Sequence, residues 1–189
     1  TLPLFLEDLK KGAPRRVYSS SQWADLSSSP IPRFDLVNKR KYASMNVQFS
    51  RGCPFSCEFC DIIEIYGRSP RTKSSEQMLA EMEAMRVAGW RGTVFIVDDN
   101  FIGNKREVRK FLPDLIAWSE RHNFPFSFLT EASVNLAEDD VLLEMMQSAG
   151  FHRVFLGIET PAPASLKEAN KSQNTKRDLL ESVRKIQSY

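Results

Sequence analysis

Four short apolar runs in this 189-residue chain are separated by stretches in which apolar residues recur every three or four positions. The runs predict strands at residues 45–50, 93–97, 126–131 and 153–159, and the intervening stretches predict helices. Strands that alternate with helices in this way form βαβ units, in which the strands pair in parallel and the helices cover the sheet. The sequence therefore predicts an α/β fold with about four βα units.

The first predicted helix can be bounded from its sequence. Ser74 and Gln77 form a capping box where it begins, and Gly89 marks where it ends. Four large apolar residues between them recur at helical spacing, and they predict a face packed against the sheet rather than a binding surface. These residues are Met78, Leu79, Met82 and Met85.

Similar signals bound the remaining elements. Asn104 and Glu107 resemble a second capping pair, and Pro113 is expected to kink or restart the helix that follows them. Gly150 is expected to end the next helix, and a polar helix is expected at the C-terminal end. The run at residues 93–97 is apolar throughout, which predicts a strand covered on both faces.

Charge and hydropathy exclude several classes of protein. The chain has 26 lysines and arginines against 24 aspartates and glutamates, a net charge of +2, so it carries no global basic footprint for nucleic acid. Hydrophobic residues make up 42% of the chain, which excludes disorder. No apolar run approaches the roughly 18 residues that a membrane span needs. We therefore expect a globular protein with no membrane span and no nucleic-acid partner.

Residues 1–40 differ in composition from the rest of the chain. They hold four of the ten prolines and two serine tracts, at residues 19–21 and 27–29, which predicts an extended linker. Residues 41–189 are expected to form the folded core. The chain begins with Thr1 and ends within a polar helical pattern, so we also expect it to be part of a longer polypeptide.

All three cysteines lie within eight residues, as Cys53, Cys57 and Cys60 in a CxxxCxxC pattern. A disulfide framework needs dispersed cysteines in even number, so a reducing, cytoplasmic compartment is expected. Structural zinc needs four ligands, and both histidines lie more than sixty residues away. A redox pair would leave one cysteine without a role, and a buried trio would leave the spacing unexplained. An iron–sulfur cluster on three thiolates would keep one iron open for a non-protein ligand.

Polar residues follow each of the later predicted strands. Asp98, Asp99 and Asn100 come after the second strand, Glu131 ends the third, and Glu159 ends the fourth. In a parallel βα array these strand ends share one edge, where catalytic groups converge, and carboxylates are costly to bury without partners. The alternative is that they cap helices or lie in exposed loops, and for Asp98 capping is an equally good explanation.

Residues 50–61, Ser-Arg-Gly-Cys-Pro-Phe-Ser-Cys-Glu-Phe-Cys-Asp, resemble the signature of the radical S-adenosylmethionine (radical SAM) superfamily, CxxxCxΦC, with Phe59 as the aromatic Φ. Other segments resemble the cobalamin-binding branch of that superfamily, which includes the hopanoid methylases. They lie at residues 66–68, 97–104, 130–133 and 157–161. The similarity extends from about residue 45 to residue 174.

The resemblance implies a fold and a chemistry. The fold would be a partial TIM-like (βα) barrel of parallel strands, truncated in this chain to about four of six βα units. Cys53, Cys57 and Cys60 would hold a 4Fe-4S cluster through three irons, and S-adenosylmethionine would chelate the fourth. Reductive cleavage of S-adenosylmethionine would then give a deoxyadenosyl radical, with the chemistry supplied by the cofactors.

By the same resemblance, several further residues would bind the cofactors. Asn100 occupies the position of the glutamate in the superfamily's GGE motif, although this chain has Asp-Asp-Asn in place of Gly-Gly-Glu. Asp99 would accept a hydrogen bond from the amino group of the methionine part of S-adenosylmethionine. Glu159 would contact the ribose hydroxyls or the methionyl end, and Phe59 would lie near the adenine. Glu131 is a further candidate at its strand end.

The branch implies cobalamin-dependent methylation of an unreactive carbon in a small-molecule or lipid-like substrate. An upstream domain outside this chain would bind cobalamin, with residues 1–40 as the linker and residues 41–189 as the N-terminal two-thirds of the radical SAM core. An electron donor such as flavodoxin or ferredoxin would be a partner. The alternative function is a non-catalytic iron–sulfur or zinc module for electron transfer or assembly.

Overall fold

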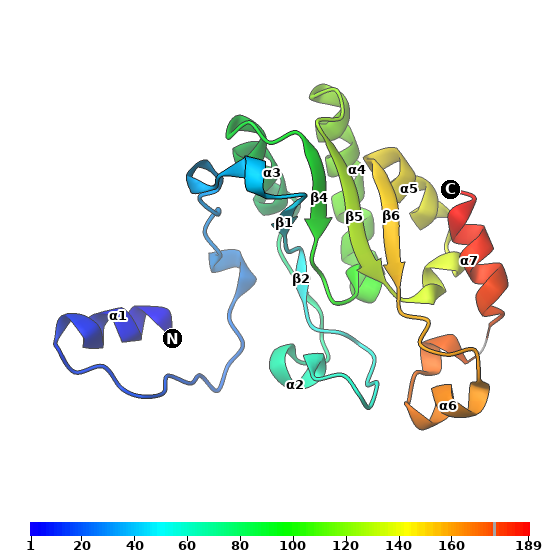
Figure 1. Cartoon of the computed structure of the whole chain (residues 1–189), viewed down its shortest axis with the longest axis horizontal. Coiled ribbons are helices and arrows are strands. Elements are labelled where there is room, and N and C mark those ends of the chain that lie inside the picture. The colour runs from blue at the N-terminus through cyan, green and yellow to red at the C-terminus, as the bar shows by residue number, and fades with distance from the viewer. Residues whose placement is uncertain (176) are drawn as a thin grey trace.

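A computed structural model describes residues 1–175 and 177–189, and its centre is a parallel sheet with helices behind it (Figure 1). The sheet has the order β1-β4-β5-β6, formed by β1 (Met45–Val47), β4 (Gly92–Ile96), β5 (Phe126–Ala132) and β6 (Phe151–Leu156). All three neighbouring pairs are parallel. A separate antiparallel ribbon joins β2 (Ser50–Arg51) to β3 (Arg71–Thr72). The predicted α/β fold with a parallel sheet is therefore confirmed.

Helices link successive strands of the sheet. The helices are α1 (Leu2–Lys10), α2 (Ile62–Tyr66), α3 (Ser75–Val87), α4 (Lys105–Arg121), α5 (Asp140–Ala149), α6 (Pro163–Glu168) and α7 (Leu179–Gln187). Figure 1 shows α3, α4 and α5 behind the sheet, while α2 and α6 lie below the arrowheads of the strands. The carboxyl ends of the strands therefore face the same end of the molecule as α2 and α6.

The core lies between the sheet and the helices behind it. The predicted capping box of Ser74 and Gln77 is present, and the methionine face of α3 is fully buried at Met78, Met82 and Met85. The sheet shares this core with aromatic rings such as Phe49 and Phe111, which stack with their centroids 5.0 Å apart. The interpretation of these methionines as core residues is confirmed.

Removing one of these methionine side chains should measurably destabilise the chain. We expect Met82→Ala to lower the free energy of unfolding by about 2–5 kcal/mol, because Met82 is 0% exposed and its truncation leaves a cavity. On the same helix Val87 is 71% exposed, so Val87→Ala should change stability by no more than about 0.5 kcal/mol. Urea unfolding followed by circular dichroism measures both, and equal losses would contradict the assignment of this face to the core.

Several predicted boundaries are wrong in detail. The last predicted strand ends at Leu156 rather than Glu159, and the polar C-terminal stretch divides into α6, a 3₁₀ turn at Ser172–Asn174, and α7. Helix α4 runs through Pro113 without restarting, because Pro113 lies on the exposed side and the buried face continues past it. The strand predicted to be covered on both faces alternates, with Val94 and Ile96 buried and Phe95 half-buried.

The first predicted strand is split into two. β1 ends at Val47, and the chain leaves the sheet at residues 48–49 before β2 begins in the ribbon at Ser50. The physical reason is Asp98, whose carboxylate accepts the backbone N–H groups of Phe49 and Ser50 at 2.8 Å each. These donors are therefore bonded to a side chain and take no part in the sheet.

Residues 1–40 are not extended throughout. Helix α1 has no buried residues, and Figure 1 shows it apart from the sheet. Leu26 and Phe34, in contrast, are buried, so the second half of this segment packs against the folded body. No helix among residues 1–175 and 177–189 combines the length and apolar character needed to cross a membrane.

Candidate functional site

The three cysteines lie in a loop that leaves the ribbon at β2. All are free thiols and half-buried. The loop is closed at its base by the Cys53 backbone N–H, which donates to the Gly67 carbonyl at 3.2 Å. A tight turn inside it brings the Cys60 N–H to the Cys57 carbonyl at 3.1 Å. These two backbone hydrogen bonds fix the path of the loop.

Gly52 is needed at the entrance to this loop. Its φ is +107°, and a Cβ at this position would lie 2.8 Å from the Gly67 carbonyl oxygen, the same oxygen that accepts from Cys53. The indole of Trp23 covers Gly67 from the other side and donates to the Ile65 carbonyl at 3.0 Å. The N-terminal segment therefore holds the base of the loop.

Substituting this glycine should disturb the loop more than a comparable glycine elsewhere. We expect Gly52→Ala to cost about 1–3 kcal/mol, because it adds a steric clash to an unfavourable backbone conformation. Gly12 also has a positive φ, +72°, but its Cβ would meet nothing within 4 Å, so Gly12→Ala should cost less than Gly52→Ala. Chemical denaturation measures the free energy of unfolding of both variants. Equal losses would show that the close approach of residue 52 to Gly67 does not affect stability.

A second segment packs on the far side of the cysteine loop. Residues 169–173, which we call the clasp, contact residues 56–59 of the loop. The Asn170 amide donates to the Ser56 carbonyl at 2.8 Å, and the Ala169 carbonyl accepts a hydrogen bond from the Glu58 N–H at 3.0 Å. The Gln173 amide donates to the Cys57 sulfur at 3.5 Å. Nothing in the sequence pattern signals the clasp, because its residues belong to a polar stretch more than a hundred positions from the cysteines.

Asp98 is a structural residue rather than a member of the site. It is 1% exposed and accepts three hydrogen bonds, from the Phe49 N–H, the Ser50 N–H and the Ser50 hydroxyl, all between 2.7 and 2.8 Å. Burial raises the pKa of Asp98 to about 6, although these hydrogen bonds oppose the shift. Its carboxylate fixes the strand that leads to the cysteine loop and does not cap a helix, the role that the sequence offered as an equally good explanation.

Asn100 lies beside the first cysteine. Its amide donates to the Ser133 hydroxyl at 3.1 Å and accepts the Ser133 backbone N–H at 3.2 Å, so the ends of β4 and β5 are tied together. Burial raises the pKa of the Cys53 thiol, and hydrogen bonds from the Phe55 backbone and the Asn100 side chain act in the opposite direction. Asn100 therefore faces the cysteine loop from the sheet.

Two carboxylates lie at the ends of the neighbouring strands, Asp99 after β4 and Glu131 within the last two residues of β5. Burial raises the pKa of Asp99, and it also raises the pKa of Glu131, with a further contribution from the negative charge of Asp99. The Oδ2 atom of Asp99 is buried and has no hydrogen-bond partner among the described residues. A buried, unpartnered carboxylate oxygen beside a second carboxylate favours a cationic ligand at this place.

Lys171 contacts both Glu159 and Phe59. Glu159 has a positive φ of +64°, unusual for a residue with a side chain, and its carboxylate pairs with the Lys171 ammonium at 2.6 Å. The same ammonium lies 5.5 Å from the centre of the Phe59 ring, which is 59% exposed. Lys171 is only 7% exposed, so the clasp brings a buried positive charge to the predicted site.

The chemistry of the three cysteines can be tested against the group that the sequence suggests. Within residues 1–175 and 177–189, no three histidine, cysteine, aspartate or glutamate side chains converge as the ligands of one metal ion. A zinc ion needs such convergence, whereas each thiolate of a 4Fe-4S cluster binds a different iron. Three free thiols in one loop, one of them accepting an amide hydrogen bond, fit the cluster.

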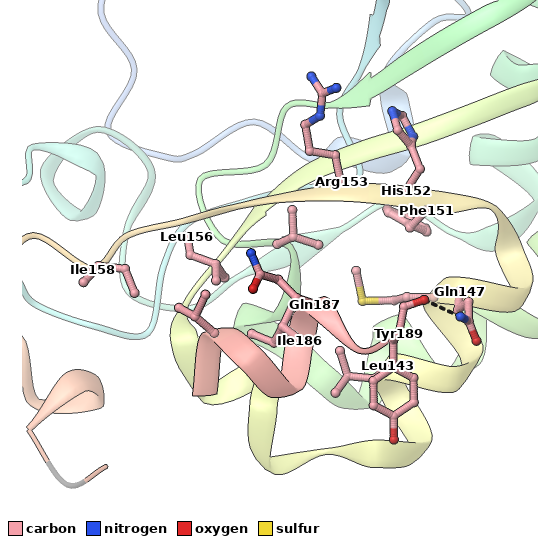
Figure 2. Close-up of a pocket in the computed structure, with 13 residues that line it drawn as sticks. Leu143, Gln147, Phe151, His152, Arg153, Leu156, Ile158, Ile186, Gln187 and Tyr189 are labelled. Atoms are coloured by element: carbon pink, nitrogen blue, oxygen red, sulfur yellow. Dashed lines mark hydrogen bonds between the residues drawn. The ribbon is translucent and has the colours of Figure 1, made fainter. Parts of the chain in front are cut away.

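A hollow lined mainly by apolar side chains lies elsewhere in the structure. It measures about 570 Å³ and is enclosed by β6, α5 and α7 (Figure 2). Apolar side chains such as Leu143, Leu156 and Ile186 line it, and at one end the Gln147 amide donates to the Tyr189 carbonyl. None of its lining residues is a predicted site residue. The candidate site is therefore the shared edge of cysteine loop, strand ends and clasp.

Comparison with protein families gives a match over most of the chain. The Radical SAM superfamily matches residues 47–189. An uncharacterized methyltransferase of Synechocystis sp. is 53% identical over 186 residues, 98% of this chain and 35% of the relative. A hopanoid C-2 methylase of Rhodopseudomonas palustris is 43% identical over 178 residues, 93% of this chain and 34% of the relative. The chain thus spans about a third of the length of these curated relatives.

A solved structure has the same fold. It is the cobalamin-dependent S-adenosylmethionine radical enzyme OxsB with aqua-cobalamin bound, with a TM-score of 0.76 at 18% identity. The match covers 96% of this chain and 30% of OxsB. The four-stranded parallel sheet of this chain therefore corresponds to part of a radical SAM TIM-like barrel.

Proposed function

The chain belongs to the radical SAM superfamily, and from that membership we propose that it is the part of a methyltransferase that holds a 4Fe-4S cluster and S-adenosylmethionine. The observation that carries the proposal is a three-thiol loop in contact with Asn100, which directly follows Asp99, whose carboxylate has a buried oxygen without a partner among the described residues. The loop can hold a cluster with one open iron, and this oxygen can accept a hydrogen bond from a bound ammonium group.

In this proposal, residues at or near the strand ends bind the cofactors. Cys53, Cys57 and Cys60 hold the cluster. Asp99, with Glu131 beside it, accepts the amino group of S-adenosylmethionine, because a buried oxygen of Asp99 has no hydrogen-bond partner among the described residues and Glu131 adds a second negative charge. Burial raises the pKa values of both carboxyls, the charge of Asp99 adds to the shift of Glu131, and a bound ammonium would lower both.

The remaining site residues orient the ligand. Asn100, held by Ser133, contacts the cysteine loop and so maintains the distance between the cluster and the sheet. Phe59 offers an exposed ring for the adenine, and Glu159 offers its second carboxylate oxygen to the ribose or methionyl end while Lys171 holds the first. When bound, the cluster and S-adenosylmethionine supply the radical chemistry by reductive cleavage of a carbon–sulfur bond.

We further propose that the whole protein methylates an unreactive carbon of a lipid-like substrate with the help of cobalamin. Support comes from the hopanoid C-2 methylase at 43% identity and from the fold of a cobalamin-dependent enzyme. Cobalamin would bind outside residues 1–189, with residues 1–40 linking the two parts. A flavodoxin or ferredoxin in a reducing cytoplasm would supply the electron, consistent with three free thiols.

Anaerobic reconstitution tests the proposal. The chain is loaded with iron and sulfide, reduced with dithionite, and studied by metal analysis and electron paramagnetic resonance with and without S-adenosylmethionine. About four irons per chain and a signal that changes with S-adenosylmethionine are expected. Asp99→Asn should weaken that change and leave the iron content intact. Bound zinc, or an iron signal insensitive to S-adenosylmethionine, would instead favour a non-catalytic module.

A further inference from the structure

We infer that Gln173 is a positioning residue whose amide hydrogen bond to the Cys57 sulfur raises the reduction potential of the cluster; the inference rests on the proposed function. The Gln173 Nε2 atom lies 3.5 Å from the Cys57 Sγ atom, within hydrogen-bonding range for sulfur. Gln173 is 8% exposed, so little water competes for this sulfur from its side. The interaction joins the clasp to the middle cysteine of the loop.

The side-chain amide of Gln173 makes one hydrogen bond among the described residues, to the Cys57 sulfur. The other end of the amide, the Gln173 Oε1 atom, is buried and has no hydrogen-bond partner among the described residues. At an exposed position, water would bond to this oxygen. A sulfur atom in a metal-bound thiolate accepts and cannot donate, so only the N–H end of the amide matches Cys57. The amide therefore occupies this place at the cost of one unsatisfied oxygen, which an apolar side chain packed here would not have.

Neighbouring contacts keep Gln173 where it is. The Asn174 amide donates to the carbonyls of Gly157 and Ile158 at 3.0 and 3.1 Å, and the Asn170 amide donates to the Ser56 carbonyl and hydroxyl. Asn170 adopts a φ of +51°, a conformation that asparagine tolerates better than most residues. Both sides of Gln173 are thus anchored, one to the sheet end and one to the cysteine loop.

The effect on the cluster follows from electrostatics. Reduction adds one electron from an external reductant and no proton, and part of the added negative charge resides on the sulfur ligands. A donor N–H aimed at one of those sulfurs stabilises the reduced form more than the oxidised form. Removing the donor should therefore make the midpoint potential more negative, and replacing it with a carboxylate should do so further.

The experiment compares midpoint potentials of reconstituted full-length chains, measured by redox titration with electron paramagnetic resonance. The variants are Gln173→Leu, which removes the amide, and Gln173→Glu, which keeps its shape and removes the donor. Gln187→Leu, which makes the same change at an exposed position outside the candidate site, is the matched control. We expect wild-type iron content throughout, the wild-type potential for the control, and more negative potentials in the order Leu then Glu.

Three outcomes would overturn the inference in distinguishable ways. Unchanged potentials in both Gln173 variants, at full iron content, would show that the hydrogen bond does not tune the cluster. Loss of iron from both variants would assign Gln173 to holding the loop instead. Failure of the wild-type chain itself to take up iron would overturn the proposed function, and the inference with it.

Discussion

Replacing Cys57 by alanine should reduce the iron held by the reconstituted chain from about four per chain to well below one, and S-adenosylmethionine cleavage should fall below detection. The chain has three cysteines in all, so no spare thiol can substitute for the lost ligand. The same result is expected for Cys53→Ala and Cys60→Ala. Metal analysis and the deoxyadenosine formed after dithionite reduction measure the two losses.

A loss of folding could imitate this result, so each variant needs a control. All three side chains are half-buried and their thiols form no disulfide, which makes them tolerant of truncation. Ser69→Ala alters an exposed side chain near the same loop and should keep full iron content. If a cysteine variant with a wild-type circular dichroism spectrum retained four irons, the assignment of that cysteine as a ligand would be wrong.

Asp98→Ala should produce the second large effect, a loss of about 3–5 kcal/mol in the free energy of unfolding. Three donors would lose their acceptor at once, two of them backbone N–H groups of Phe49 and Ser50 in a fully buried place. Asp98→Asn should recover little, because its one oxygen cannot serve both sides and its NH₂ group would face a donor. Urea denaturation at pH 7.5 measures both variants against the wild type.

The pH dependence of this difference follows from the pKa of Asp98. Burial raises that pKa to about 6 in the folded chain, above the ordinary value of 3.8, so the folded state binds the proton more tightly than the unfolded state. The stabilisation from this group is therefore complete below about pH 4 and is lost as the pH rises through 6. The difference in stability between wild type and Asp98→Ala should grow by about 2 kcal/mol from pH 7.5 to pH 4.5.

Measuring the difference between two chains cancels every other titrating group that they share. Unfolding curves at four or five pH values between 4.5 and 7.5 are sufficient. A difference that stays constant, or that shrinks as the pH falls, would mean that the three hydrogen bonds outweigh burial and that Asp98 remains ionised throughout.

The sequence was most informative where one local pattern determines one local structure. The Ser74–Gln77 capping box, the buried face of α3 and the stop at Gly150 depend on contacts within a few residues, and all three are present. The parallel sheet follows from the alternation of elements, and the superfamily from the cysteine spacing. Each of these features can be predicted without knowing which distant segments of the chain contact one another.

Features that depend on distant contacts were missed. Asp98 looked like a strand-end carboxylate, and only the approach of Phe49 and Ser50, 48 or 49 residues earlier, makes it a structural acceptor. The sequence predicts a polar helix across the clasp, and no pattern in it marks the amides that contact the cysteine loop. Glu159 was placed inside a strand that ends three residues earlier, at Leu156.

The clasp also fixes an order of events during protein synthesis. Asn170 lies 114 residues after Ser56, and Gln173 lies 116 residues after Cys57, so the ribosome releases the cysteines long before the residues that close over them. Such contacts are slow to form, because a long loop of chain must first be closed. Iron and sulfide delivered to the nascent chain would meet an unclasped loop, and a cluster bound before the clasp forms would be shielded only after residue 173 has left the ribosome.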